Sequence, residues 1–285
     1  MSFFHAPIHD TNKSPIVLKN PVMIADLHLG VSTPGLVTMF LDFMQALHTH
    51  PLLKTRQELV ILGDLFDAWL GDDTRDSLAP VMAALREFSA HRALYIMQGN
   101  RDFLMGGELA RAVGAELIAD PVRAHIGTGA SSLVALLSHG DRWCTADERY
   151  QTVRARLRNP WIQRGLLALP RFVRVAVAKN ARAKSQRAKA QVVRQEILDV
   201  TPSAVCDEAR AEQVDLVIHG HTHRPGMHAL AASPIQFTLG KPLSRGTRIV
   251  LADWLERDGT PTKGDALVFE AGSPKRLELT TLLAA

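Results

Sequence analysis

Five short clusters of aspartate, asparagine and histidine punctuate the chain, and each follows a short apolar run directly or after one residue. They are Asp26-Leu27-His28, Gly63-Asp64-Leu65-Phe66-Asp67, Gly99-Asn100-Arg101-Asp102, His139-Gly140-Asp141 and His219-Gly220-His221-Thr222-His223. Oxygen donors and imidazoles without thiolates suit divalent cations such as Mn²⁺, with Fe or Zn as alternatives. Two ions about 3.5–4 Å apart can share a carboxylate and activate a water for in-line attack on phosphorus. The clusters therefore predict a two-metal site for phosphoester or diphosphate cleavage.

One such cluster alone is a weak indication of a metal site. An aspartate at a strand end often caps a helix, and a buried histidine often binds a backbone carbonyl. Five clusters in the same register after five apolar runs make that structural interpretation much weaker than the metal site.

The elements that must position these clusters are the apolar runs, which are rich in Val, Ile and Leu and predict buried strands. In open α/β sheets the carboxyl ends of the strands converge on one edge, which would gather the clusters into one site. Between the runs, apolar residues at helical spacing predict helices at Leu36-Leu47, Leu78-Ser89 and Gly107-Val113. Later runs with Gly and Pro turns predict an antiparallel C-terminal sheet. The five early runs are Val22-Ala25, Leu59-Leu62, Leu94-Met97, Leu133-Leu137 and Val214-Ile218, and the later ones are Arg248-Ala252, Ala266-Phe269 and Arg276-Thr281.

Length and composition indicate one ordinary soluble globular domain of residues 1–285, because 285 residues with 46% hydrophobic side chains can bury a full core. Cys144 and Cys206 are too few for a disulfide framework or a thiolate metal site. The opening residues lack a signal-peptide pattern, and no run of eighteen apolar residues occurs. We therefore expect a cytoplasmic protein that is neither secreted nor membrane-spanning.

Residues 145–200, called the helical insertion below, contain no strand-like run and predict several helices broken near Pro160 and Pro170. Residues 151–195 hold twelve Lys or Arg and no Asp or Glu. Subtracting this +12 from the formal charge of +4 leaves −8 on the rest of the chain. Such asymmetry indicates an anionic partner: nucleic acid, phospholipid head groups or a phosphorylated substrate. A merely solvated helical face would normally mix both signs.

The ordered motifs Asp-x-His, Gly-Asp-x-x-Asp, Gly-Asn-x-Asp, His-Gly and Gly-His-x-His resemble the calcineurin-like metallophosphoesterase superfamily from Asp26 to His223. The resemblance implies an α/β sandwich of two β-sheets flanked by helices, with the helical insertion as a cap. It implies two metals bridged by Asp64: one held with Asp26, His28 and His223, the other with Asn100, His139 and His221. Asp64, Asn100, His139 and His221 would be the catalytic residues, with Asp67 and Asp102 supporting the ligands through hydrogen bonds.

Longer strings are similar to the UDP-2,3-diacylglucosamine diphosphatase family of the lipid A pathway. They include Ile-Ala-Asp-Leu-His-Leu, Gly-Asp-Leu-Phe-Asp-Ala-Trp-Leu-Gly-Asp-Asp, Gly-Asn-Arg-Asp-Phe-Leu, His-Gly-His-Thr-His-Arg-Pro and the run from His139 to Tyr150. This resemblance implies hydrolysis of UDP-2,3-diacylglucosamine at the uridine-side phosphorus with two Mn²⁺ per chain, giving UMP and 2,3-diacylglucosamine 1-phosphate (lipid X). The twenty residues before the first strand and the segment from Val250 to Trp254 match the family only loosely.

The same resemblance implies where the substrate binds. Many superfamily members have His where this chain has Arg101. The arginine guanidinium is always charged, so it suits phosphate binding better than acid catalysis. The expected substrate contacts are Asn100, Arg101, Asp147, Ser185, Lys189 and His221. Apolar residues among the arginines of the helical insertion would lodge acyl chains, although about half could simply pack the insertion on the core. These are Trp161, Ile162, Leu166, Leu167, Leu169, Phe172, Val173 and Val175.

An amphiphilic substrate together with the basic insertion predicts peripheral binding to an anionic membrane surface, at the cytoplasmic face of the bacterial inner membrane. The main alternative is a nuclease or cyclic-nucleotide phosphodiesterase whose basic segment binds nucleic acid. The few aromatic residues there disfavour stacking on bases, so we expect no nucleic acid partner. A non-catalytic interaction module on the same fold should have lost ligands, and a membrane adaptor does not explain the metal clusters. No obligate protein partner is evident.

Overall fold

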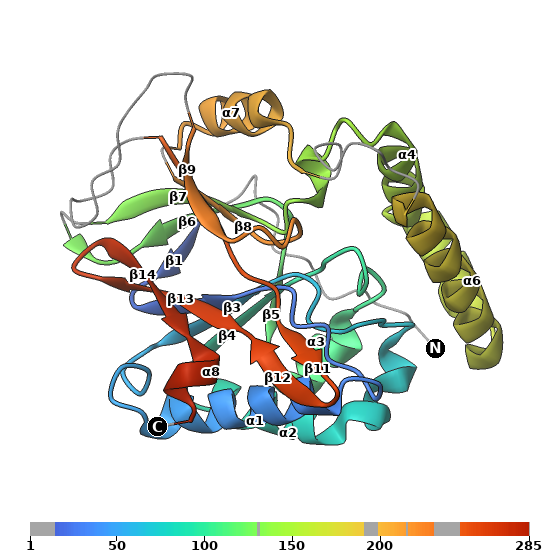
Figure 1. Cartoon of the computed structure of the whole chain (residues 1–285), viewed down its shortest axis with the longest axis horizontal. Helices are drawn as coiled ribbons and strands as arrows, with labels where there is room; N and C mark the ends of the chain where they lie inside the picture. The colour runs from blue at the N-terminus through green and yellow to red at the C-terminus, as the bar shows by residue number, and fades with distance from the viewer. Residues whose placement is uncertain (1–14, 130–131, 191–198, 215, 231–245, 285) are drawn as a thin grey trace.

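The computed structural model describes residues 15–129, 132–190, 199–214, 216–230 and 246–284, with the backbone alone for residues 181–190. Within this part of the chain two six-stranded β-sheets are stacked on one another, and helices cover their outer faces (Figure 1). This arrangement confirms the α/β sandwich expected from the sequence motifs.

The first sheet has the strand order β14-β13-β2-β3-β4-β5. Strands β2 to β5 are parallel, and β13 joins β2 in the antiparallel sense. β3 is buried at all five positions, as expected for a parallel strand covered on both faces. The strands are β2 (Pro21–Ile24), β3 (Glu58–Leu62), β4 (Ala93–Met97), β5 (Glu116–Ile118), β13 (Asp265–Glu270) and β14 (Ser273–Glu278).

The second sheet has the strand order β1-β6-β7-β8-β10-β9. Strands β7, β8 and β10 are mutually parallel, whereas β6 and β9 run antiparallel to their neighbours β7 and β10. A separate hairpin joins β11 (Leu255–Arg257) and β12 (Thr260–Lys263). The strands of the second sheet are β1 (Ile16–Leu18), β6 (Val122–Ile126), β7 (Leu133–Ser138), β8 (Leu216–His219), β9 (Gly226–Ala229) and β10 (Thr247–Val250).

Alternation of side chains along the strands creates separate apolar layers. In β2, Val22 faces a core shared with helices, whereas Met23 faces the core between the two sheets. The helices α1 (Pro34–Thr49), α2 (Ala79–Ser89) and α3 (Gly107–Val113) supply the outer core of the first sheet. Helix α7 (Pro202–Ala211) packs on the second sheet through Val205 and Ala209. The two sheets and the helices on their outer faces form four layers. Apolar cores between these layers hold the strands in place.

The helical insertion contains α4 (Glu148–Leu157), α5 (Pro160–Ala168) and α6 (Arg171–Ala190), so helices do begin after the breaks expected from the prolines. Asn159 caps α5, since its side chain accepts a hydrogen bond from the amide of Trp161 at 2.9 Å. Figure 1 shows α4 and α6 beside the sandwich rather than over its sheets. Short helical segments complete the description: η1 (Asp72–Leu78), η3 (Asp141–Trp143) and α8 (Leu279–Leu282).

Two expectations about the sheets were wrong. The five cluster-bearing strands do not share one sheet, because β2, β3 and β4 lie in the first and β7 and β8 in the second. The later runs also do not form one antiparallel sheet. β13 and β14 do pair antiparallel, but β10 is a parallel neighbour of β8. In addition, β1 lies within the stretch before the first predicted strand. Strand pairing depends on contacts between distant segments, which local patterns do not encode.

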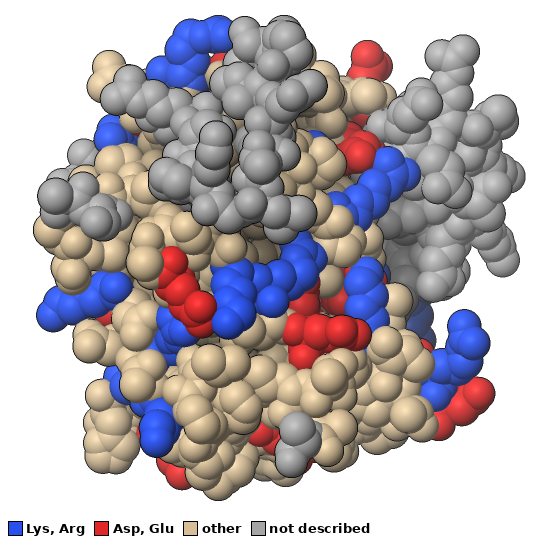
Figure 2. All heavy atoms as spheres, turned by 60° about the vertical axis from the view of Figure 1, so that its left-hand side comes forward, with Lys and Arg blue, Asp and Glu red and all other residues tan. Residues whose placement is uncertain are grey.

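Charge is mixed on the face of the molecule in Figure 2, where Lys and Arg side chains lie beside Asp and Glu side chains. Among the described residues, no helix is both long and apolar enough to cross a membrane.

Candidate metal centre

The five sequence clusters come together at the carboxyl ends of strands from both sheets. Two groups of possible metal ligands arise there: Asp26 with His28 and His223, and Asp26 with Asp64 and His139. Within each group the donor atoms lie within 4.8 Å of one another. The structure thus brings four of the predicted ligands from the first sheet and three from the second to one place.

The loops that carry these residues adopt an unusual backbone conformation. Among the described residues, eight other than glycine have a positive φ, and five of these are candidate ligands. This left-handed region typically costs about 1–3 kcal/mol per residue when it is strained, and such residues gather at functional sites. The φ angles are 54° for Asp26, 53° for His28, 52° for Asp64, 69° for His221 and 56° for His223.

Glycines in the clusters allow the loops to approach one another closely. A Cβ atom on Gly99 would lie 2.1 Å from Oδ1 of Asp64, and one on Gly220 would lie 2.3 Å from Oδ2 of Asp26. Neither carboxylate could move away without leaving the centre. Gly99 and Gly220 are therefore steric requirements of the neighbouring carboxylates.

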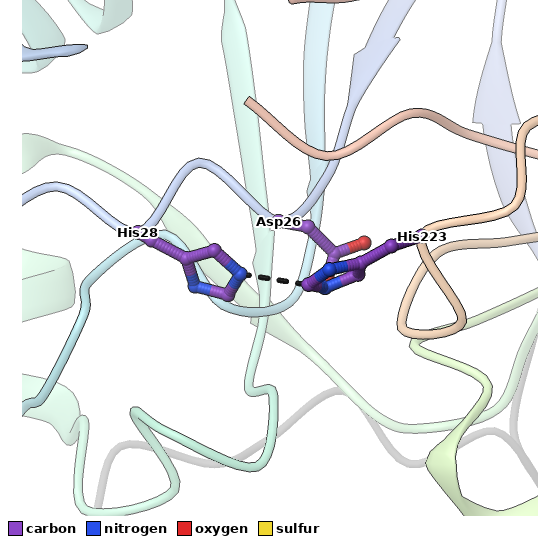
Figure 3. Close-up of side chains that lie close together, drawn as sticks. All are labelled: Asp26, His28 and His223. Atoms are coloured by element: carbon purple, nitrogen blue, oxygen red, sulfur yellow. Dashed lines mark hydrogen bonds and ion pairs between the residues drawn. The ribbon is translucent and has the colours of Figure 1, made fainter. Parts of the chain in front are cut away.

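The first donor group joins the ends of β2 and β8. Nε2 of His28 and Nε2 of His223 lie 3.5 Å apart, and Oδ1 of Asp26 lies 3.6 Å from Nε2 of His223. Figure 3 shows the two imidazoles pointing toward one another with the Asp26 carboxyl beside His223. A further contact holds this carboxylate in place, since Oδ2 of Asp26 accepts a hydrogen bond from the amide of His221 at 2.7 Å.

The second donor group extends from Asp64 and His139 to Asn100 and His221. Oδ1 of Asn100 lies 3.0 Å from Nε2 of His139 and 3.1 Å from Nδ1 of His221. Oδ1 of Asp64 lies 3.8 Å from Nε2 of His139, and Oδ2 lies 3.9 Å from Nδ1 of His28. Asp64 therefore lies near His28 of the first donor group as well as His139 of the second, which is the place expected for a shared ligand.

Hydrogen bonds fix the orientation of two rings. Nδ1 of His139 lies 3.1 Å from the carbonyl of Leu62, to which it can donate only when protonated. In the neutral ring, Nε2 then faces the centre with its lone pair. Nδ1 of His223 likewise lies 3.2 Å from Oδ2 of Asp253, whose other oxygen accepts a hydrogen bond from Lys263. Outer partners of this kind orient ligating imidazoles.

Electrostatics favour positive charge in the centre. Burial lowers the pKa of His139, but Asp64 and Asp26 outweigh it and raise this pKa to about 9. Burial also lowers the pKa of His223, and hydrogen bonds to Asp253 and Asp26 raise it to about 9. In contrast, burial next to charged His139 lowers the pKa of His221 to about 4. The carboxylates therefore keep His139 and His223 protonated, and a bound cation could replace these protons.

Buried ligand atoms that make no hydrogen bond also indicate a metal site. Among the described residues, Oδ1 of Asp26 and Nδ1 of His28 are buried and make no hydrogen bond. Unpaired buried polar atoms are costly and rare, so such atoms in one centre call for an ion. The donors are oxygens and imidazoles, and they fit a hard or borderline divalent cation.

The predicted supporting residues have contacts at the edge of the centre. Asp102 accepts hydrogen bonds from the amides of Gly99 at 2.6 Å and Phe66 at 3.3 Å, and so ties two ligand loops together. Burial raises the pKa of Asp102 to about 7. Arg101 pairs with Asp67 at 2.7 Å, and its amide donates to Oδ1 of Asp64 at 2.8 Å. The guanidinium is 31% exposed, so an anionic ligand could reach it.

The remaining predicted substrate contacts lie on the helical insertion. Asp147 is the N-cap of α4 and accepts a hydrogen bond from the amide of Tyr150 at 2.9 Å. Ser185 and Lys189 belong to α6, and their side chains lie outside the described residues. Trp161 and Phe172 are each 75% exposed, and Ile162, Leu167 and Leu169 are also exposed.

Sequence reasoning gave no role to several residues that contact the predicted ligands. Asp253 follows β10 and orients His223, although it lies thirty positions further along the chain. Tyr150 stacks on His221 with ring centroids 5.9 Å apart. Asp120 accepts a hydrogen bond from the amide of His139 at 3.2 Å. The sequence signals were the position of Asp253 after a predicted strand and of Tyr150 at the end of a motif, whereas no predicted strand or motif stood beside Asp120.

Convergent oxygen and imidazole donors at the strand ends of this sandwich define a metal-dependent hydrolase. A sequence model of the calcineurin-like phosphoesterase family matches residues 22–225, a span that includes every candidate ligand. The chain belongs to the calcineurin-like phosphoesterase family. Family membership and the two donor groups indicate dependence on a divalent metal.

Similar proteins extend over almost the whole chain. UDP-2,3-diacylglucosamine hydrolase from Chromohalobacter salexigens is 41% identical over 259 residues, covering 90% of this chain and 95% of that protein. The enzymes of that name from Bordetella parapertussis and Haemophilus influenzae are 39% and 38% identical; they cover 90% and 87% of this chain, and the chain covers 93% and 96% of them. A solved archaeal phosphodiesterase covers 91% of this chain and 99% of its own, but 10% identity and a TM-score of 0.41 are too remote to bear on function.

Proposed function

We propose that the protein hydrolyses UDP-2,3-diacylglucosamine at the uridine-side phosphorus, giving UMP and 2,3-diacylglucosamine 1-phosphate (lipid X), a step of lipid A biosynthesis. The observation that carries this proposal is the similarity to hydrolases of that name over about nine tenths of the chain, helical insertion included. The geometry of the centre is compatible with this reaction, because all seven candidate metal ligands lie together in it.

We assign two Mn²⁺ ions to the centre, with Asp64 as the shared ligand. Asp26, His28 and His223 would complete one site, and Asn100, His139 and His221 the other. When bound, two such ions supply charge neutralisation for the diphosphate and a lowered pKa for an attacking water. Distances of 3.5 to 3.9 Å among the donor atoms of His28, His139, His223 and Asp64 are long for direct hydrogen bonds and support the assignment.

Four residues would act directly on the reacting phosphate through this arrangement. Asp64, Asn100, His139 and His221 would hold the reacting groups in position, and contacts of Asn100 with both rings keep them close together. Arg101 would bind a phosphate oxygen with its partly exposed guanidinium while Asp67 keeps it in place. Asp147, Ser185 and Lys189 would contact the glucosamine and its phosphate. Positioning and charge neutralisation supply most of the rate in phosphoryl transfer.

The helical insertion would serve as a cap for the lipid part of the substrate, on a single domain of residues 1–285. Trp161 and Phe172 offer exposed apolar surface beside cations such as Arg164, whose guanidinium lies 5.1 Å from the Trp161 ring. An interfacial helix has this mixture, and each basic residue contributes about 1 kcal/mol toward an anionic membrane. We therefore place the enzyme at the cytoplasmic face of the bacterial inner membrane, as a peripheral protein.

The experiment that tests the function uses purified protein loaded with Mn²⁺ and three substrates in parallel. These are UDP-2,3-diacylglucosamine, its deacylated analogue and single-stranded DNA. We expect cleavage of the acylated nucleotide, much slower cleavage of the deacylated one, none of the DNA, and loss of activity with a chelator. Cleavage of DNA alone would instead establish the nuclease alternative, and activity that survives chelation would exclude the two-metal mechanism.

A further inference from the structure

One face of α4 is turned toward the second donor group. Tyr150, Arg154 and Arg158 are spaced by four residues and so share a side of the helix. Each makes polar contacts with the core rather than with solvent alone. Sequence reasoning had counted both arginines among the cations available to an anionic partner.

Arg158 forms hydrogen bonds to the backbone directly before Asn100, a predicted ligand. Its Nη2 atom donates to the carbonyls of Gln98 and Gly99, both at 3.1 Å, and Nη1 donates to Oε1 of Gln98 at 3.2 Å. The next residue is Asn100, whose Oδ1 atom contacts both His139 and His221. One guanidinium therefore fixes the two peptide units that aim the Asn100 side chain.

Arg154 reaches the loop of His139 through two carboxylates. It forms ion pairs with Asp141 at 2.8 Å and with Asp120 at 3.2 Å. Oδ1 of Asp120 accepts hydrogen bonds from the hydroxyl of Ser138 at 2.6 Å and from the amide of His139 at 3.2 Å. Arg154 thus compensates the buried charges that hold the His139 backbone in place.

Tyr150 completes this face. Its hydroxyl donates to Oδ2 of Asp141 at 2.8 Å, and its ring stacks on His221 with an interplanar angle of 28°. The α4 face therefore supports the surroundings of Asn100, His139 and His221, the three ligands that only the second metal site uses. The first site has a separate support on the core, where Asp253 and Lys263 hold His223.

We propose that the face of α4 formed by Tyr150, Arg154 and Arg158 is a brace that sets the geometry of one metal site and leaves the other to the core. The inference rests on the proposed two-metal function. It makes the arginines positioning residues, because they act through the backbone of the ligands and touch neither metal nor substrate. The brace also couples the helical insertion to the metal centre, so displacement of the insertion would weaken the binding of one ion.

The test replaces Arg158 by Met and counts bound Mn²⁺ by calorimetric titration of the chelator-treated protein, with Arg156→Met as the matched control. Arg156 is exposed and lies between the two bracing arginines on α4. Removing such an outer support typically costs about 10- to 100-fold in metal affinity. We expect that loss for one of the two ions, less than about twofold change for the other, and no change in R156M. Arg158→Lys should recover part of the loss, since an ammonium can still bind one carbonyl.

Folding is checked by thermal unfolding of each variant. If R158M does not fold, Tyr150→Phe keeps the ring and removes only the hydroxyl, and it should weaken the same ion by a few fold. Equal weakening of both ions, or two unchanged ions, in the folded variant would overturn the brace. A wild-type protein that binds no Mn²⁺ would instead overturn the proposed function, so the two failures are distinguishable.

Discussion

The ligand loops at the strand ends and the helical insertion contrast in almost every physical respect. Asp26, Asp64 and His139 are at most 1% exposed and sit on loops with little freedom, whereas Trp161 and Phe172 are each 75% exposed. The loops hold a surplus of buried carboxylate charge, and the insertion holds a surplus of cations. The ligand loops keep a fixed geometry, whereas the helical insertion exposes apolar and cationic side chains to solvent.

The contrast is less complete at the contact between the two regions. Of the seven Lys and Arg in residues 151–180, three turn inward: Arg154, Arg158 and Arg174. Arg174 is buried, and it binds the carbonyl of Leu70 and the carboxylate of Asp73. A charge count along the sequence therefore overestimates what the insertion can offer to an anionic partner. Part of its charge fastens the insertion to the core.

The largest expected effect tests the fixed region. Asp64→Ala removes the carboxylate that lies near both His28 and His139, and we expect the turnover number to fall by on the order of 10³-fold or more. Steady-state hydrolysis of UDP-2,3-diacylglucosamine measures the loss. Asp76→Ala is the control, because Asp76 is exposed on η1. Substantial residual turnover in D64A would argue against a shared carboxylate.

A second prediction concerns protons held in the fixed region. In the metal-free protein the pKa values of His139 and His223 both lie near 9, so at pH 7 each ring carries a proton that a metal must displace. His221, with a pKa near 4, is already neutral. Raising the pH from 6 to 8 should therefore strengthen Mn²⁺ binding by up to about 100-fold per ion, one proton being released at each site.

The measurement is calorimetric titration in buffers of different ionisation enthalpy, which reports the number of protons released. Well above pH 9 both rings are neutral before the metal binds, and the dependence of affinity on pH should disappear. An affinity that does not change between pH 6 and pH 8 would contradict the proton displacement and the surplus of carboxylate charge in the loops.

The ligand loops were also the part of the molecule that sequence reasoning described best. The candidate ligands lie within a few residues of a strand end, and Gly99 and Gly220, which make room for Asp64 and Asp26, directly precede Asn100 and His221. The requirement is therefore local, and a motif can express it. Expected strands and helices around these loops agree with the structure to within a few residues; α3 at Gly107–Val113 is one case.

What the sequence did not predict depends on long-range contacts. Membership of β10 in the second sheet follows from pairing with β8, and that pairing places Asp253 against His223. Likewise, Arg158 looks like any exposed cation of a helix until α4 lies against the loop of Gln98. Neither partner is marked by spacing, because the contacts join segments at least thirty residues apart.

The fastening of the insertion gives a prediction of intermediate size. Arg174→Met should lower the free energy of unfolding by about 1–3 kcal/mol, because it leaves the carbonyl of Leu70 and the carboxylate of Asp73 without their charged donor. Lys179→Met, an exposed change on the same helix, is the control. Chemical denaturation followed by circular dichroism measures the difference. Equal midpoints and slopes for the two variants would show that the inward arginine does not fasten the insertion.

The smallest effect on stability is expected where the insertion is most exposed. Replacing Trp161 and Phe172 together by Ala should change the free energy of unfolding by no more than about 0.5 kcal/mol, because both side chains are already 75% exposed. Binding to vesicles that contain anionic lipid should nevertheless weaken by at least about tenfold, since a buried aromatic side chain contributes about 1.5–3 kcal/mol.

Val31→Ala is the matched control for that experiment, because Val31 is 77% exposed but lies on a loop beside the ligand cluster rather than on the insertion. Co-sedimentation with vesicles at fixed ionic strength measures all three proteins, and denaturation confirms that they are equally stable. If the double variant and the control bind vesicles equally, exposed aromatic residues on α5 and α6 do not make the insertion a membrane surface. The contrast with the ligand loops would then be one of packing density alone.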